Sequence, residues 1–179
     1  MLFVTLHVAA DIPCHNKHNK KMEKKLFIDL FAGCGGVAKG FCDADFECVI
    51  ANEFDEKAAI TYRSNFNHPL VVGDITHPEV KQQLYDVVGD KKVDAVVGGF
   101  PCQGFSMSGK RLVDDPRNQL FREFVEVVKI TKPKIVVGEN VEGILSMDNG
   151  EVVRQIIEEF SNLGYKMEYK VLNAADYGV

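Results

Sequence analysis

The sequence contains no tryptophan, no Cys-x-x-Cys pair and no apolar run of the roughly 18–20 residues that a membrane span needs. Its five cysteines are odd in number and irregularly spaced, so we expect reduced thiols rather than a disulfide framework, and no bound metal. Lys and Arg total 21 against 26 Asp and Glu, a net charge of −5. Because a nucleic-acid-binding domain usually shows a basic face, this charge disfavours DNA binding by the stretch alone.

The Gly-x-Gly-x-x-Gly motif of dinucleotide binders is also missing, which argues against a nicotinamide-dependent oxidoreductase. A different glycine turn is present: Ala32-Gly33-Cys34-Gly35-Gly36 follows the apolar run of residues 26–31. Glycines let backbone N–H groups approach a ligand, and the start of a helix favours a negative group. The carboxylate of a methionine-type cofactor would suit this turn.

Five βα units followed by a strand predict an α/β fold with a doubly wound, mostly parallel sheet. The expected strands are residues 26–31, 47–52, 70–72, 93–97 and 135–137, with a sixth at 165–172. Asp55 is predicted to cap the helix that runs to Asn65, and Thr76-His77-Pro78-Glu79 has the form of a capping box for the next helix. We expect a flexible extension over residues 1–21 and one domain over residues 22–179.

Acidic residues follow several of these strands. Glu53 lies about 20 residues beyond the glycine turn, where nucleotide-binding folds place a carboxylate for ribose hydroxyls, although it could instead help to start a helix. Asp74 ends the third strand and Glu139 the fifth; Asp74 could equally be an ordinary turn residue. Since parallel strands share one carboxyl edge, these groups should meet at the topological switch point.

A cysteine follows the fourth strand, in the stretch Gly98-Gly99-Phe100-Pro101-Cys102-Gln103-Gly104-Phe105-Ser106. Pro101 stiffens the backbone before Cys102. A thiol beside an acid suits nucleophilic addition with proton assistance, whereas an isolated Pro-Cys pair would read as an ordinary loop. Residues 104–117 form a polar, glycine-hinged and locally basic segment, long enough to act as a lid.

The Pro-Cys-Gln motif and the Phe-Ala-Gly-x-Gly-Gly turn resemble those of the DNA (cytosine-5) methyltransferases, and the resemblance covers about residues 25–179. It implies a Rossmann-like fold that uses S-adenosylmethionine and methylates carbon 5 of cytosine, as in restriction–modification. In this family the cysteine attacks carbon 6 of a flipped-out cytosine. An acid at ring N3 stabilises the charge that develops.

The resemblance also implies a role for individual residues of this chain. The nucleophile would be Cys102 and the acid that holds the base would be Glu139. The cofactor would be bound by Phe31, Ala32, Gly33, Gly35, Gly36, Glu53, Asp74, Ile75, Pro101 and Leu120. The DNA around the flipped nucleotide would be contacted by Gln103, Ser106, Ser108 and Lys110.

The family pattern continues, beyond its Asp-Tyr-Gly, with an arginine-bearing motif, a target-recognition region and a final helix, which do not follow Asp176-Tyr177-Gly178 here. We therefore expect a fold truncated after its sixth strand and a chain that is inactive by itself. Double-stranded DNA and a C-terminal chain carrying the recognition region are the expected partners, with no membrane. The expected location is the bacterial cytoplasm, or the nucleus of a eukaryote. An inactive cofactor-binding subunit and a methyltransferase of tRNA cytosine remain alternatives.

Overall fold

The computed structural model describes residues 2–4, 24–101 and 119–178. Its main feature is a five-stranded parallel sheet with the strand order β4-β3-β2-β5-β6. The strands of this sheet are β2 Lys25–Leu30, β3 Phe46–Glu53, β4 Leu70–Val72, β5 Ala95–Gly98 and β6 Ile135–Gly138. The helices are α1 Gly36–Asp43, α2 Glu56–Asn65, α3 Pro78–Val88, α4 Gln119–Thr131 and α5 Glu151–Asn162, with short 3-10 turns η3 Glu142–Leu145, η4 Met147–Gly150 and η5 Ala174–Tyr177.

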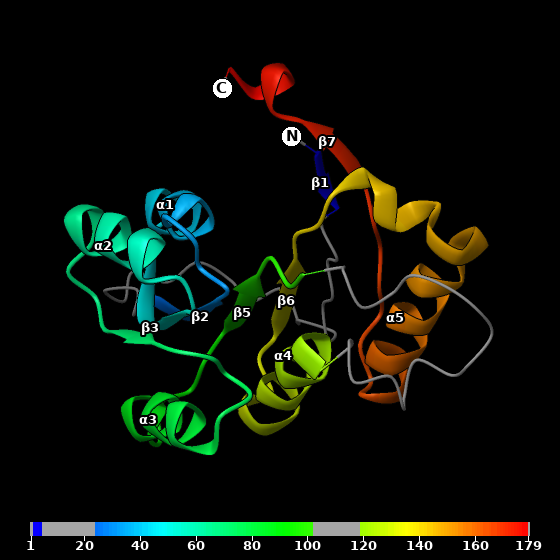
Figure 1. The fold of residues 1–179 in the computed structure, drawn as a ribbon. Helices are drawn as coiled ribbons and strands as arrows, with labels where there is room; N and C mark the ends of the chain where they lie inside the picture. The colour runs from blue at the N-terminus through cyan, green and yellow to red at the C-terminus, as the bar shows by residue number, and fades with distance from the viewer. Residues whose placement is uncertain (1, 5–23, 102–118, 179) are drawn as a thin grey trace, which may run out of the picture.

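Helices cover both faces of the sheet, which confirms the predicted doubly wound architecture (Figure 1). On one face, α3, α4 and α5 pack on the sheet and bury an apolar cluster that includes Val96, Phe124 and Phe160. On the other, α1 and α2 bury a smaller cluster around Phe27 and Tyr62. The buried runs in β2, β3 and β5 are therefore those of strands enclosed from both sides.

Two helix starts were predicted, and one prediction was wrong. The carboxylate of Asp55 accepts a hydrogen bond of 2.8 Å from the N–H of Ala58 and caps α2 as expected. The capping box at residues 76–79 does not form: His77 is the cap residue of α3, without a side-chain bond, and Pro78 opens the helix. The N–H of Thr76 bonds instead to Asp74, which leaves Thr76 in the turn before the helix.

The predicted sixth strand is also different in the structure. The strand β7 is Val171–Asn173, and it pairs antiparallel with β1, Leu2–Val4, in a separate two-stranded sheet. Tyr165 and Met167 pack against the larger core, and the hydroxyl of Tyr165 donates to the carbonyl of Pro133 at 2.8 Å. The alternating pattern thus marked the side of the chain that faces the core. Alternation identifies a buried face but not a hydrogen-bonding neighbour.

Candidate functional site

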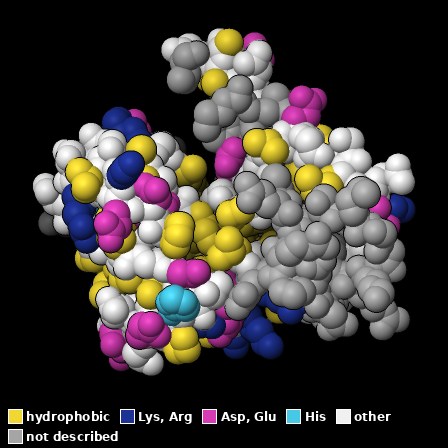
Figure 2. Space-filling model, viewed as in Figure 1, with side chains coloured by type: hydrophobic (Ala, Val, Ile, Leu, Met, Phe, Trp, Pro, Cys, Tyr) yellow, Lys and Arg dark blue, Asp and Glu magenta, His cyan; other side chains and the backbone are white. Residues whose placement is uncertain are grey.

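The carboxyl ends of the five parallel strands lie on one edge of the sheet, and the predicted acidic residues follow them. From the central strand β2, the chain adds β3 and β4 on one side and β5 and β6 on the other. The switch point between β2 and β5 is where an open α/β sheet places a ligand crevice. Figure 2 shows hydrophobic side chains gathered at the centre of the viewed face, with acidic and basic side chains scattered around them.

The turn after β2 adopts a backbone conformation that few residues tolerate. Phe31, Gly33 and Gly35 have φ values of +55°, +56° and +93°. The left-handed conformation is unfavourable for a side-chain-bearing residue such as Phe31, at a cost of roughly 1–2 kcal/mol. Such strain is characteristic of ligand-binding turns. The turn ends at Gly35, the cap of α1, so the first N–H groups of that helix lie beside it.

Glu53 links this turn to the end of β3. Its side chain is 9% exposed, and one carboxylate oxygen accepts a hydrogen bond of 2.6 Å from the N–H of Gly33. The other accepts one of 2.7 Å from the N–H of Asp55. Each carboxylate oxygen has a second lone pair, so Glu53 can still accept from ligand hydroxyls. Glu53 thus bonds both the glycine turn and the turn that leads into α2, while its contact with ribose hydroxyls stays a prediction.

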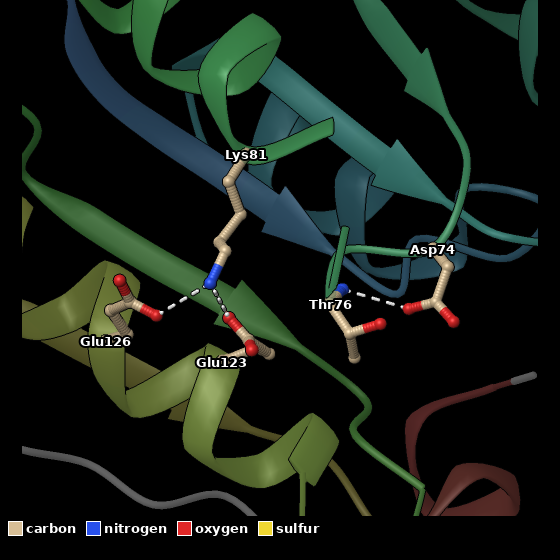
Figure 3. Close-up of polar contacts among 5 residues, drawn as sticks. All are labelled: Asp74, Thr76, Lys81, Glu123 and Glu126. Atoms are coloured by element: carbon tan, nitrogen blue, oxygen red, sulfur yellow. Dashed lines mark hydrogen bonds and ion pairs between the residues drawn. The ribbon is translucent and has the colours of Figure 1, made fainter. Parts of the chain in front are cut away.

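The turn after β4 holds Asp74 and Ile75. One carboxylate oxygen of Asp74 accepts from the N–H of Thr76 at 2.9 Å (Figure 3). The side chain of Ile75 is buried. Asp74 thus makes the bond expected of a turn residue, and its second oxygen makes no hydrogen bond among the described residues; its contact with the cofactor stays a prediction.

A partly buried ion pair connects α3, the helix after this turn, to α4. The ammonium group of Lys81 in α3 lies 2.8 Å from a carboxylate oxygen of Glu123 and 3.1 Å from one of Glu126 (Figure 3). Leu120, a predicted cofactor contact, is half-buried one turn before Glu123. The ion pair thus holds α4, which carries Leu120, against α3, which follows Asp74.

Two residues near the glycine turn escaped the sequence interpretation. Phe54, directly after Glu53, is 70% exposed and offers a flat aromatic surface at the strand end. Asp29 in β2 is fully buried, and neither carboxylate oxygen has a hydrogen-bond partner among the described residues. Burial, and then the nearby charge of Glu53, raise the pKa of Asp29 to about 8. In the sequence, Asp29 is recognisable only as a single acidic residue inside an otherwise apolar strand.

We expect Asp29→Asn to stabilise the protein more at pH 8 than at pH 5. The folded-state pKa lies above the ordinary value of 3.8, so wild type loses stability as the pH rises from about 4 to 8. Urea unfolding at several pH values measures the difference, and a gain that is the same at every pH would contradict this prediction.

Asp94 provides a control in which the expected effect has the opposite sign. Burial acts to raise the pKa of Asp94, but hydrogen bonds from Lys134 and from the N–H of Leu26 outweigh burial and lower it. Asp94→Asn should therefore destabilise the protein at neutral pH.

Glu139 lies beside the segment that leads to the predicted nucleophile. Its N–H donates to the carbonyl of Gly98 at 3.0 Å. A Cβ atom on Gly99 would stand 2.6 Å from a carboxylate oxygen of Glu139, so the acid and the segment are in close contact. Burial raises the pKa of Glu139, which favours its protonated form. A protonated carboxyl is what donation to a ring nitrogen requires.

Five predicted residues, namely Cys102, Gln103, Ser106, Ser108 and Lys110, lie outside the described part of the chain. The structure does describe both ends of that interval. Pro101 is exposed, and the rings of Phe100 and Phe121 are 5.1 Å apart, which joins the end of β5 to the first turns of α4. In the described ranges there is no group of three or more His, Cys, Asp or Glu residues that could hold a metal ion.

The glycine turn and Glu53 fit a cofactor with a methionine part and a ribose, since they combine close backbone N–H groups with a strand-end carboxylate. The sequence pattern of the C-5 cytosine-specific DNA methylase family matches residues 26–179. The chain belongs to this family. The family uses S-adenosylmethionine and acts on DNA.

Individual methylases agree over the same residues. The type II methyltransferase M1.HphI of Haemophilus parahaemolyticus is 46% identical over 157 residues, which are 86% of this chain and 42% of that protein. The type II methyltransferase M.AquIA of Picosynechococcus sp. is 41% identical over 169 residues, which are 88% of this chain and 68% of that protein. A solved E. coli prophage protein assigned as a DNA modification methyltransferase superposes with a TM-score of 0.62 at 32% identity, over 78% of this chain and 38% of that chain.

The chain spans about two-fifths of the length of M1.HphI and of the prophage protein, and it corresponds to their N-terminal part. None of the helices in the described ranges has the length and apolar character of a membrane span.

Proposed function

We propose that this chain provides the cofactor pocket and the catalytic groups for methylation of cytosine carbon 5 in DNA. The contact between Gly99 and the carboxyl of Glu139 carries the proposal, because it places an acid with a raised pKa beside the backbone that leads to Cys102. That contact lies at the sheet edge where Glu53 binds the glycine turn.

The cofactor would lie along this edge. The residues that would bind its methionine part are Phe31, Ala32, Gly33, Gly35 and Gly36. Glu53 would accept from the ribose hydroxyls, Asp74 and Ile75 would contact the adenine, and Pro101 and Leu120 would close the pocket. Bound S-adenosylmethionine supplies an electrophilic methyl group next to the target base.

The chain's own groups would prepare the base to receive that methyl group. The thiolate of Cys102 adds to carbon 6 of cytosine, which moves electron density onto carbon 5. The protonated carboxyl of Glu139 donates to ring N3 and stabilises the developing charge. Once carbon 5 has taken up the methyl group, it would lose its proton to water, and the electrons of that C–H bond would re-form the ring double bond as the bond between the sulfur and carbon 6 breaks and releases the Cys102 thiolate. Because the base must leave the duplex, Gln103, Ser106, Ser108 and Lys110 are proposed to contact the surrounding strand.

We expect the 179-residue chain alone to transfer no methyl groups to DNA and to bind duplex DNA weakly at physiological salt. The net charge is −5, and phosphate contacts supply most non-specific affinity. The test is transfer of labelled methyl groups to unmethylated DNA by this chain and by a fusion to the part of M1.HphI that follows the matched segment. The fusion should turn over.

Turnover by the chain alone would contradict the expected dependence on a C-terminal part. A fusion that is folded and binds cofactor, but methylates tRNA and not DNA, would contradict the proposed substrate. A fusion that neither binds cofactor nor methylates any cytosine would contradict the proposed function itself.

A further inference from the structure

The segments that follow β5 and β6 leave the sheet side by side. Gly98 and Gly138 are paired in the parallel register of the two strands. The next residue of β6's extension, Glu139, bonds through its N–H to the carbonyl of Gly98. Two residues beyond this pair, at Phe100 and Asn140, the two segments are joined by a side-chain hydrogen bond instead of a backbone one.

That side chain is Asn140, which is 6% exposed. Its amide nitrogen donates to the carbonyl of Phe100 at 2.8 Å, and its amide oxygen accepts from the N–H of Val141 at 2.9 Å. The second bond fixes the orientation of the amide, so the nitrogen faces Phe100. Buried polar groups that are bonded at both ends specify one local structure.

Phe100 is held from its other side as well. Its ring is buried and lies 5.1 Å from the ring of Phe121 and 5.5 Å from that of Phe124. The side chain thus anchors the segment to α4, while Asn140 anchors its carbonyl to the end of β6. Between these anchors, Gly99 leaves the space that the carboxyl of Glu139 occupies.

We propose that Asn140 is a positioning residue that holds the Phe100–Pro101 backbone beside Glu139. The inference rests on the proposed function, in which Glu139 and Cys102 act on the same base. Cys102 is bonded directly to Pro101, and consecutive Cα atoms are about 3.8 Å apart, so a displacement of Pro101 is passed to Cys102. Loss of the Asn140 amide should therefore weaken the coupling between the thiol and the acid.

The coupling is measured by the pH profile of Cys102 alkylation with iodoacetamide, followed by peptide mass mapping. Four forms of the 179-residue chain are compared: wild type, Glu139→Gln, Asn140→Ala and the double variant. Where no base is bound, the Glu139 carboxyl is charged at the alkaline pH at which a thiol titrates, and a nearby negative charge raises the pKa of a thiol, so Glu139→Gln should lower the pH midpoint in wild type. In the Asn140→Ala background, the same change should shift the midpoint by less than half as much. Equal shifts in the two backgrounds, or none in wild type, would overturn the proposal.

Asn52→Ala is the matched control. Asn52 is also a buried asparagine at a strand end, and its amide nitrogen donates to the carbonyls of Val71 and Gly73 at 3.2 and 3.1 Å. Its loss should leave the coupling unchanged, and a reduction equal to that of Asn140→Ala would refute a specific role for Asn140. If Asn140→Ala fails to fold by circular dichroism, Asn140→Asp replaces it, because an ionised carboxylate can still accept from Val141 but cannot donate to Phe100. Full coupling in that variant would also refute the proposal.

Calorimetry with S-adenosylmethionine on the fusion used to test the proposed function separates the two proposals. Intact coupling in the chain, together with a fusion that binds no cofactor, would refute the proposed function and leave the role of Asn140 standing. Cofactor binding without coupling would refute the role of Asn140 alone.

Discussion

Cys102→Ser is expected to abolish methyl transfer by the complete enzyme, with a loss on the order of 10⁴-fold or more. The thiolate is the nucleophile of the proposed reaction, and a serine hydroxyl does not ionise at neutral pH without a dedicated base. The fusion described above provides the assay, with labelled methyl incorporation as the measurement. DNA that carries 5-fluorocytosine should trap wild type as a covalent complex, because the fluorine cannot leave as a proton does.

Cys42→Ser is the matched control for this experiment. Cys42 is a half-buried free thiol on α1 that packs against the smaller apolar cluster around Phe27 and Tyr62. Its replacement should leave both turnover and trapping in place. Covalent trapping that survives in Cys102→Ser would assign the nucleophile to another residue and contradict the proposal.

Glu53→Ala is expected to weaken S-adenosylmethionine binding by roughly 5- to 150-fold. The loss corresponds to about 1–3 kcal/mol for hydrogen bonds to a buried ligand group. The substitution also leaves the N–H groups of Gly33 and Asp55 without their acceptor, so the glycine turn loses its link to β3. Isothermal calorimetry on a form that binds the cofactor well measures the change directly.

Glu53→Gln separates the two contributions. Glutamine keeps the length of the side chain and one oxygen that can accept from Gly33, but it cannot accept at both positions. Its affinity should fall between those of wild type and Glu53→Ala. If Glu53→Ala binds the cofactor as tightly as wild type does, the proposed ribose contact is incorrect.

Much of the fold follows from local features of the sequence. Short apolar runs predicted the five parallel strands to within two residues at each end, and Asp55 predicted the start of α2. The failures came where local pattern and tertiary context disagree. Thr76 has the sequence of a helix cap, but Asp74 bonds its N–H and Pro78 starts the helix one residue later. Residues 165–172 alternate as a strand does, yet Tyr165 packs on the core without joining the main sheet.

The sequence by itself determined the family and the chemical groups at stake: the glycine turn, Glu53, Glu139 and the Pro101-Cys102 pair are readable from residue type and spacing. Only the tertiary structure decided how those groups relate. The bond from Gly33 to Glu53, the contact of Gly99 with Glu139, and the bond from Asn140 to Phe100 join residues 20 to 40 positions apart. Such contacts depend on strand order and parallel register, which periodicity does not encode, because the same alternation is compatible with many pairings.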